Sequence, residues 1–145
     1  MKNFEAISHV SLGPVHIGAN RSVIHSTLGV PETTFEKAPG SVHPTDAWFN
    51  NALQVFYTSE GVVEFVEVTG DSGIEVLCFD FPVFATDAEL LMDRFMEQAD
   101  FQVEGGGCSF LSGALDIALW RPDSEGPENK FFARACQNFS VNPGS

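Results

Sequence analysis

The chain has few basic residues. Seven Lys and Arg oppose 20 Asp and Glu among 145 residues, so the formal net charge is −13. Because a phosphate backbone must be neutralised by Lys and Arg, this balance argues against direct binding to nucleic acid. Twelve of the acids and one base lie between Glu60 and Glu104, which gives that stretch a net charge of −11. Such a surface attracts a basic protein partner, or serves only solubility.

Long apolar runs and paired cysteines are also absent. No run approaches the roughly 20 apolar residues that a membrane helix needs, and the first residues lack the apolar core of a signal peptide. The cysteines, Cys78, Cys108 and Cys136, are odd in number and show no Cys-x-x-Cys spacing. We therefore expect a cytoplasmic protein with reduced, buried thiols and no contact with a membrane.

Motifs for catalysis are missing as well. The chain has no P-loop, no nucleophile elbow and no glycine-rich dinucleotide motif. None of its four histidines has the spacing of a metal site. His43 and Asp46, in HPTDAW, form the one local pair suited to acid–base or metal chemistry, although a turn capped by Asp46 explains the same residues. We expect no enzymatic activity, no cofactor and no metal.

The apolar pattern predicts an α+β fold. Hydrophobic residues make up 43% of the chain and 14 residues are Phe, which is typical of a globular protein. We expect an antiparallel sheet with two helices packed on one face. The predicted strands cover 4–12, 47–49, 52–57, 62–68, 74–79, 101–103, 114–120 and 130–137. One helix is expected from Asn20 to Gly29 with the stripe Val23, Ile24 and Leu28, and a second after a capping box at Thr86 with the stripe Ala88, Leu91, Met92, Phe95 and Ala99.

The two strands at 52–57 and 62–68 predict a hairpin with distinct faces. The turn over 58–61 predicts a register in which Val55 lies opposite Glu64. In this register one face points to the core, with Leu53, Val55, Tyr57 and Val66, and the other face carries Phe56, Phe65 and Glu67.

The order of helix, strand and hairpin occurs twice. The two helix caps are 66 residues apart, the Ala-Leu pairs at 52 and 114 are 62 apart, and the Ser-Glu-Gly turns at 59 and 124 are 65 apart. A nearly constant offset indicates an internal duplication. The chain over 1–145 is therefore either one α+β domain with two unrelated hairpins, or two fused repeats covering 1–70 and 73–138.

The stretch GPVHIGANRSVIHSTLGVP, residues 13–31, resembles the opening of β-lactamase-inhibitor-protein-like and outer-membrane-assembly-lipoprotein-like domains. The shared features are a starting glycine, a short helix and Leu-Gly-x-Pro. This resemblance implies helices followed by an antiparallel sheet, and in the β-lactamase inhibitor protein a tandem repeat of that unit. In size, acidity and lack of a catalytic motif, the chain is also similar to immunity proteins of bacterial toxin systems.

We expect a non-catalytic, acidic protein-binding module. The specific hypothesis is an immunity protein that neutralises a basic bacterial toxin, such as a nuclease, by covering its active surface. The alternatives are an envelope scaffold or assembly domain, and a small metal-dependent hydrolase using His43 and Asp46. Residues on the open sheet face and in the acidic stretch are expected to contact the partner, unless they form plain core: Trp48, Phe56, Glu64, Phe65, Glu67, Asp71, Glu75, Asp116 and Trp120.

Overall fold

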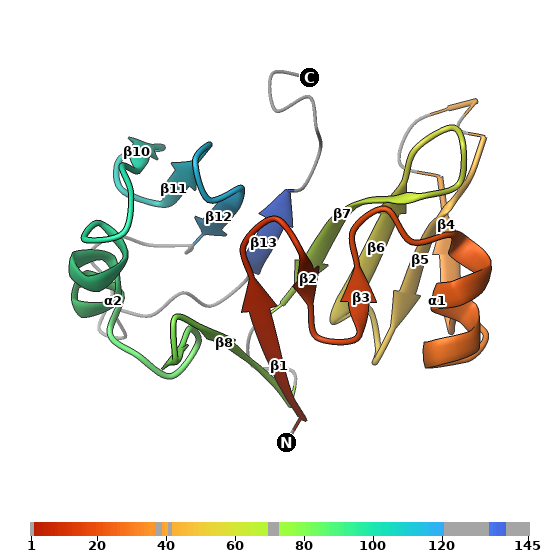
Figure 1. Cartoon of the computed structure of the whole chain (residues 1–145), viewed down its shortest axis with the longest axis horizontal. Helices are drawn as coiled ribbons and strands as arrows, with labels where there is room; N and C mark the ends of the chain where they lie inside the picture. The colour runs from red at the N-terminus through yellow and green to blue at the C-terminus, as the bar shows by residue number, and fades with distance from the viewer. Residues whose placement is uncertain (1, 37–38, 41, 70–72, 121–133, 139–145) are drawn as a thin grey trace.

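A computed structural model describes residues 2–36, 39–40, 42–69, 73–120 and, for the backbone, 134–138. It has the mixed α+β composition that the sequence predicts (Figure 1). The helices are α1 Arg21–Leu28 and α2 Ala88–Phe95. The strands are β1 Lys2–Ile7, β2 Ser11–Leu12, β3 Val15–His16, β4 Thr33–Phe35, β5 Thr45–Trp48, β6 Leu53–Tyr57, β7 Val63–Val68, β8 Ile74–Cys78, β9 Phe81–Pro82, β10 Gln102–Glu104, β11 Ser109–Ser112, β12 Ile117–Trp120 and β13 Arg134–Asn138. None of the described helices is long and apolar enough to cross a membrane.

The larger sheet has eight strands in the order β10-β11-β12-β13-β7-β6-β5-β4, and all of its pairs are antiparallel. Strands from the first half of the chain form one side, and strands from the second half form the other. The two sides meet where β7 pairs with β13, with Val66 opposite Gln137. One continuous sheet therefore runs through both halves, because the pairing of β7 with β13 joins them.

The smaller sheet has five strands in the order β3-β2-β1-β8-β9. Its central pair is parallel, with Lys2 opposite Ile74 and Ala6 opposite Cys78, so the partners are 72 residues apart. The expected purely antiparallel arrangement is wrong for this pair. Parallel neighbours need a long crossover connection, and here the whole first half of the chain supplies it. Figure 1 shows β1 and β8 between α1 and α2, which lie at opposite ends of the molecule.

One hydrophobic core joins both helices and both sheets. Four residues of the predicted α2 stripe are confirmed, because Ala88, Leu91, Met92 and Phe95 are all buried, whereas the fifth, Ala99, is half-buried and lies beyond the helix end at Phe95. In α1 only Ile24 is buried, whereas Val23 is exposed, so the predicted stripe of this helix is too wide. An eight-residue helix is not stable alone in water, and its stability must come from packing.

The hairpin has the predicted faces but not the predicted register. Val55 lies opposite Val66 instead of Glu64, and a bulge between Phe56 and Tyr57 follows. The shift is two residues, which preserves the side of the sheet to which each side chain points. It also places Leu53 opposite Val68, and both side chains are fully buried. The extra apolar pair favours this register, and the bulge next to the turn allows the two strands to pair in it although the turn residues alone predict another register.

Three local predictions are wrong. The turn expected around His43 and Asp46 extends only to Pro44, because strand β5 begins at Thr45 and includes Asp46. The side chain that caps α2 is Asp87, whose carboxylate accepts from two N–H groups of the first turn, and the Thr86 hydroxyl donates to a carbonyl before the helix. The strand expected over 4–12 is divided into β1 and β2 by a turn in which His9 has a φ of 64°.

A candidate site around a buried carboxylate

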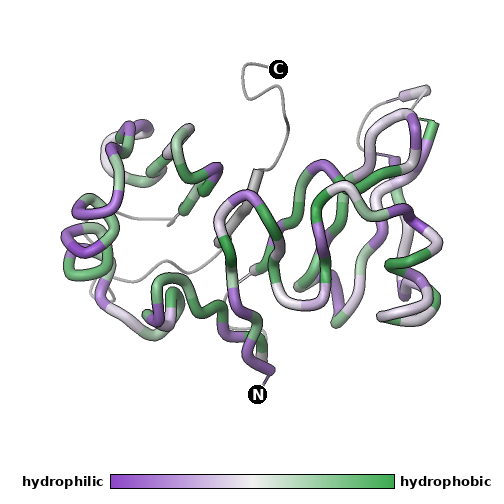
Figure 2. The backbone as a smooth tube through the Cα atoms, viewed as in Figure 1, coloured by the Kyte–Doolittle hydropathy of each residue, from purple (hydrophilic) through white to green (hydrophobic). Residues whose placement is uncertain are grey.

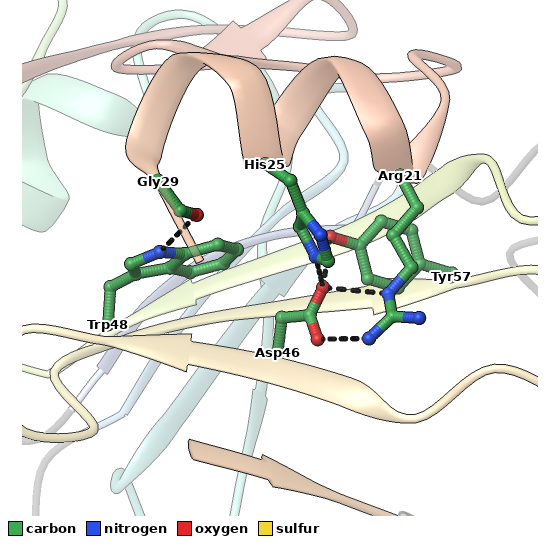
Figure 3. A network of polar contacts seen from close by, with 6 residues as sticks. All are labelled: Arg21, His25, Gly29, Asp46, Trp48 and Tyr57. Atoms are coloured by element: carbon green, nitrogen blue, oxygen red, sulfur yellow. Dashed lines mark hydrogen bonds and ion pairs between the residues drawn. The ribbon is translucent and has the colours of Figure 1, made fainter. Parts of the chain in front are cut away.

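Asp46 lies in β5 with its side chain completely buried. Its Oδ1 accepts from Arg21 Nη2 at 2.8 Å, and its Oδ2 accepts from Arg21 Nε at 2.9 Å. Oδ2 also lies 2.6 Å from His25 Nε2 and 2.8 Å from the Tyr57 hydroxyl (Figure 3). An ionised carboxylate only accepts hydrogen bonds, so the ring nitrogen Nε2 and the phenol must both donate. Three side chains thus converge on one buried charge.

The positions of the donors follow from helix and strand geometry. Arg21 and His25 are four residues apart on α1, so they lie on one face of the helix, one turn from each other. Asp46 is opposite Val55 in the sheet, and Tyr57 follows Val55 by two residues, so both polar groups lie on the side that faces α1. The start of α1 is held by a hydrogen bond from the backbone N–H of Arg21 to the carbonyl of residue 61. The end is held by Trp48 Nε1, which donates to the carbonyl of residue 29 at 3.2 Å.

The network keeps Asp46 ionised. Burial is the largest influence and by itself raises the pKa of this carboxyl, but the hydrogen bonds from Arg21, His25 and Tyr57 together outweigh it and lower the pKa below 3.8. The hydrogen bond to Asp46 raises the pKa of the Arg21 guanidinium. Burial, and then the hydrogen bond to Asp46, raise the pKa of Tyr57, so the phenol keeps its proton and acts as a donor. The assembly is a guanidinium–carboxylate pair with two further donors.

The predicted pair of His43 and Asp46 does not form. His43 is half-buried, and its ring lies against Gly61, where an added Cβ would come within 3.0 Å of Nε2. Both oxygens of Asp46 are occupied by other donors. In the part of the chain that the structure describes, no group of three or more His, Cys, Asp and Glu could hold a metal ion.

Sequence reasoning missed Arg21, His25 and Tyr57. A signal was present: two polar side chains with i, i+4 spacing, Arg21 and His25, lie close to the buried Ile24 and therefore beside the apolar face of the helix. Tyr57, the only tyrosine of the chain, is predicted on the core face of the hairpin, where its hydroxyl requires a hydrogen-bond partner. A buried phenol requires such a partner, and Asp46 is the one it finds.

The matching positions in the other half of the sheet are apolar. In the first half, Asp46 in β5 is paired with a residue of β4 on one side and a residue of β6 on the other. In the second half, Phe110 in β11 is paired in the same way with residues of β10 and β12. The first and fifth residues of α1 are the donors, whereas those of α2 are Ala88 and Met92. Helix–sheet packing of this kind therefore does not require the polar network.

The aromatic residues predicted to contact a partner are dispersed. Trp48 is 2% exposed and belongs to the core. Phe56 and Phe65 pack edge to face across the hairpin, with ring centroids 5.2 Å apart, and Phe56 is also buried. Trp120, at the end of β12, is 38% exposed. Trp120 is therefore the most accessible of the four.

The acidic residues of the same prediction also differ in their surroundings. Glu67 and Glu75 are buried, and the Glu75 carboxylate accepts from two backbone N–H groups at 3.0 and 2.9 Å. Asp116 lies 2.8 Å from the His9 ring, and Glu64 is half-buried. Asp71 lies outside the described residues. The structure does not gather these acids into one exposed patch.

Exposed acids gather instead on and beside α2. Seven are exposed, and the one base of this stretch, Arg94, lies 3.6 Å from Glu97. Four large apolar side chains are exposed among them, namely Phe79, Leu90, Met96 and Val103. The seven acids are Asp80, Asp87, Glu89, Asp93, Glu97, Asp100 and Glu104. We call these acids and the four apolar residues the α2 surface.

Neither a protein-family profile, nor a curated protein, nor a solved structure matches the chain. The resemblance to β-lactamase-inhibitor-like and lipoprotein-like domains therefore stays a prediction, and function has to be argued from the described residues.

Proposed function

We propose that the chain is a non-catalytic, acidic protein-binding module of the cytoplasm. In its specific form it is an immunity protein that neutralises a basic bacterial toxin, such as a nuclease, by covering the toxin's active surface. It needs no cofactor or metal for this role. The observation that supports the proposal is the exposure of seven acids over 80–104, against one base that is itself paired. Such a field accelerates capture of a basic protein and repels nucleic acid.

In this proposal the Asp46 network serves structure. Both carboxylate oxygens are occupied, so no oxygen is left to take a proton from a substrate without breaking an existing bond. The bonds to Arg21 and His25 fasten α1 to the sheet. The alternative hydrolase based on His43 and Asp46 gains no support from this geometry, and no described feature favours an envelope scaffold.

We also propose that the fold arose by tandem duplication of a helix–hairpin unit, with both helices covering the same face of the long sheet. Each half contains strands of the small sheet (three in the first half and two in the second), then an eight-residue helix, then four strands of the large sheet. Buried residues of both helices belong to one core with β6, β7 and β12, which supports a shared face. A tandem repeat is also what the resemblance to the β-lactamase inhibitor protein implies.

The protein encoded beside this chain's gene provides the test. The two purified proteins should form a complex in calorimetry, and the complex should abolish the partner's toxic activity. Affinity should fall steeply between about 0.01 M and 1 M salt, because the Debye length shrinks from roughly 30 Å to 3 Å. Absence of a complex, or an affinity indifferent to salt, would reject charge-steered inhibition.

A further inference from the structure

We infer that the outer face of α2 is the docking surface for a basic, amphipathic segment of a protein partner. This inference rests on the proposed function and gives it a location. The partner segment would place apolar side chains on Leu90 and Met96 while its Lys and Arg residues meet Glu89, Asp93 and Glu97.

The two faces of α2 are chemically distinct. The inner face is buried in the core. On the outer side, Leu90 is 47% and Met96 is 43% exposed, and acids flank both residues. Outside the helix, Phe79 is 37% exposed, and its ring packs edge to face on the buried Phe95 ring with the centroids 5.5 Å apart. Figure 2 shows hydrophobic and hydrophilic residues intermixed along α2 and its flanks.

The equivalent face of α1 acts as an internal comparison. Both helices have eight residues, and the third residue of each is an exposed aliphatic side chain, Val23 in α1 and Leu90 in α2. The second and sixth residues are Ser22 and Ser26 in α1, where α2 has acids. A helix in this setting therefore does not need acids at these positions.

The acids also have an energetic cost. Like charges four residues apart destabilise a helix by roughly 0.2–0.5 kcal/mol per pair. The ion pair between Arg94 and Glu97 offsets little of this, because both side chains are at least half exposed. Within α2 only Glu89 and Asp93 form such a pair, and the helix dipole offsets part of its cost because Glu89 lies in the first turn.

The same charges select the kind of occupant. A second copy of the chain would bring two acidic faces together, and a nucleic acid would bring phosphates, so both are repelled. A basic protein segment neutralises the rim, and its apolar side chains cover Leu90 and Met96. Protein interfaces combine apolar contacts with charged ones, and Met adapts its shape to a partner.

The experiment compares α2 with α1 at equal change of charge. Glu89→Ser with Asp93→Ser transfers the α1 residues to α2 and raises the net charge by two. Ser22→Lys with Ser26→Lys on α1 raises it by the same amount. Leu90→Ser and Val23→Ser form the apolar pair of variants. Circular dichroism and thermal melts check that all four variants fold.

Two probes are used in calorimetry. One is the protein encoded beside the gene, and the other is a synthetic amphipathic Lys/Leu peptide, with its Glu/Leu counterpart as control. Each α2 variant should weaken binding at least about tenfold, as expected at an interface hot spot, and each α1 variant should change it less than about twofold. Amide chemical shifts induced by the Lys/Leu peptide should map to 86–104.

The outcomes separate this inference from the proposed function. Equal losses for the α1 and α2 variants would show that only total charge matters, and unchanged binding of the α2 variants would place the interface elsewhere. Either result overturns the inference while leaving inhibition of the neighbouring protein intact. If that protein does not bind at all, the proposed function fails, and the peptide mapping still decides whether α2 is a docking surface. Self-association that is lost in Leu90→Ser would make the surface homotypic and would also overturn the inference.

Discussion

Replacing Asp46 by Asn removes the buried charge on which the Arg21, His25 and Tyr57 side chains converge. The amide has nearly the same shape as the carboxylate, so packing is preserved. One acceptor oxygen becomes an NH₂ group that points at donors, and the guanidinium loses its counter-charge. Breaking a buried ion pair by removing one partner costs about 3–5 kcal/mol.

The expected loss of stability is smaller than this, because the side chains that lose Asp46 as a partner are partly exposed to water. Arg21 and His25 are 27% and 30% exposed in their side chains, so water solvates part of the orphaned donors. We therefore expect Asp46→Asn to lower the free energy of unfolding by about 2–4 kcal/mol. For a chain of this length, that loss corresponds to a fall in Tm of roughly 5–15 °C.

Urea and thermal denaturation at neutral pH provide the assay. Asp116→Asn is the matched control, because Asp116 pairs with a His9 side chain that is 52% exposed, and Asn tolerates the positive φ of this position. The control should cost less than about 1 kcal/mol. If Asp46→Asn costs no more than the control, the network does not stabilise α1 against the sheet, and the reasoning fails.

The cost should also depend on pH with a defined sign. The folded state lowers the pKa of Asp46 below its ordinary 3.8, so the stabilisation is fully present above that value and is lost as the pH falls through the lowered pKa. The stability difference between the variant and the natural chain should therefore be present at pH of about 5.5 and should shrink as the pH falls below 3.8. A difference that grows on acidification would contradict the assignment.

Three further predictions concern other buried groups. Tyr57 is the only tyrosine, and its pKa is raised by burial. The native chain should therefore show little phenolate absorbance at pH of about 10.5, where a free phenol is mostly ionised. The absorbance should appear together with unfolding, because the stabilisation from the protonated Tyr57 is lost as the pH rises above the ordinary tyrosine pKa of 10.0. A variant with Cys78 as its sole cysteine should not react with a thiol reagent at pH of about 8 until denaturant is added, because burial raises the pKa of this thiol to about 12. Glu75→Ala should cost about 1–3 kcal/mol by leaving two N–H groups without an acceptor, whereas Glu64→Ala should stay within about 0.5 kcal/mol.

Features with a local period could be predicted from the sequence. The stripe of α2 follows from the spacing of Leu91, Met92 and Phe95, and the hairpin faces follow from alternation around Leu53 and Val55. Both depend only on which side of an element a residue occupies. The register could not be predicted, because the bulge at Phe56 depends on the partner strand and leaves no mark in the turn residues.

The candidate site could be predicted only in part. The sequence predicts Asp46 only together with His43, three residues before it. Its actual partners come from α1 and from the neighbouring strand β6, as in the bonds from Arg21 and Tyr57, 25 and 11 residues away. Which of several polar residues meet at such a distance is decided by how a helix is placed on a sheet, and no spacing in the sequence encodes that placement.

The joint between β7 and β13 has a consequence for the order of events during synthesis. When the first half leaves the ribosome, β1 and β7 each lack a neighbour, because β8 and β13 are made later. Until then, β7 presents an unpaired backbone edge that can template the β7 of another nascent chain. Strand pairs separated by about 70 residues in sequence also slow folding, because the connecting chain loses conformational entropy before the contacts between the strands can form. β13 therefore covers the β7 edge of the first half, and a chain that ends before β13 leaves this edge open and prone to aggregation.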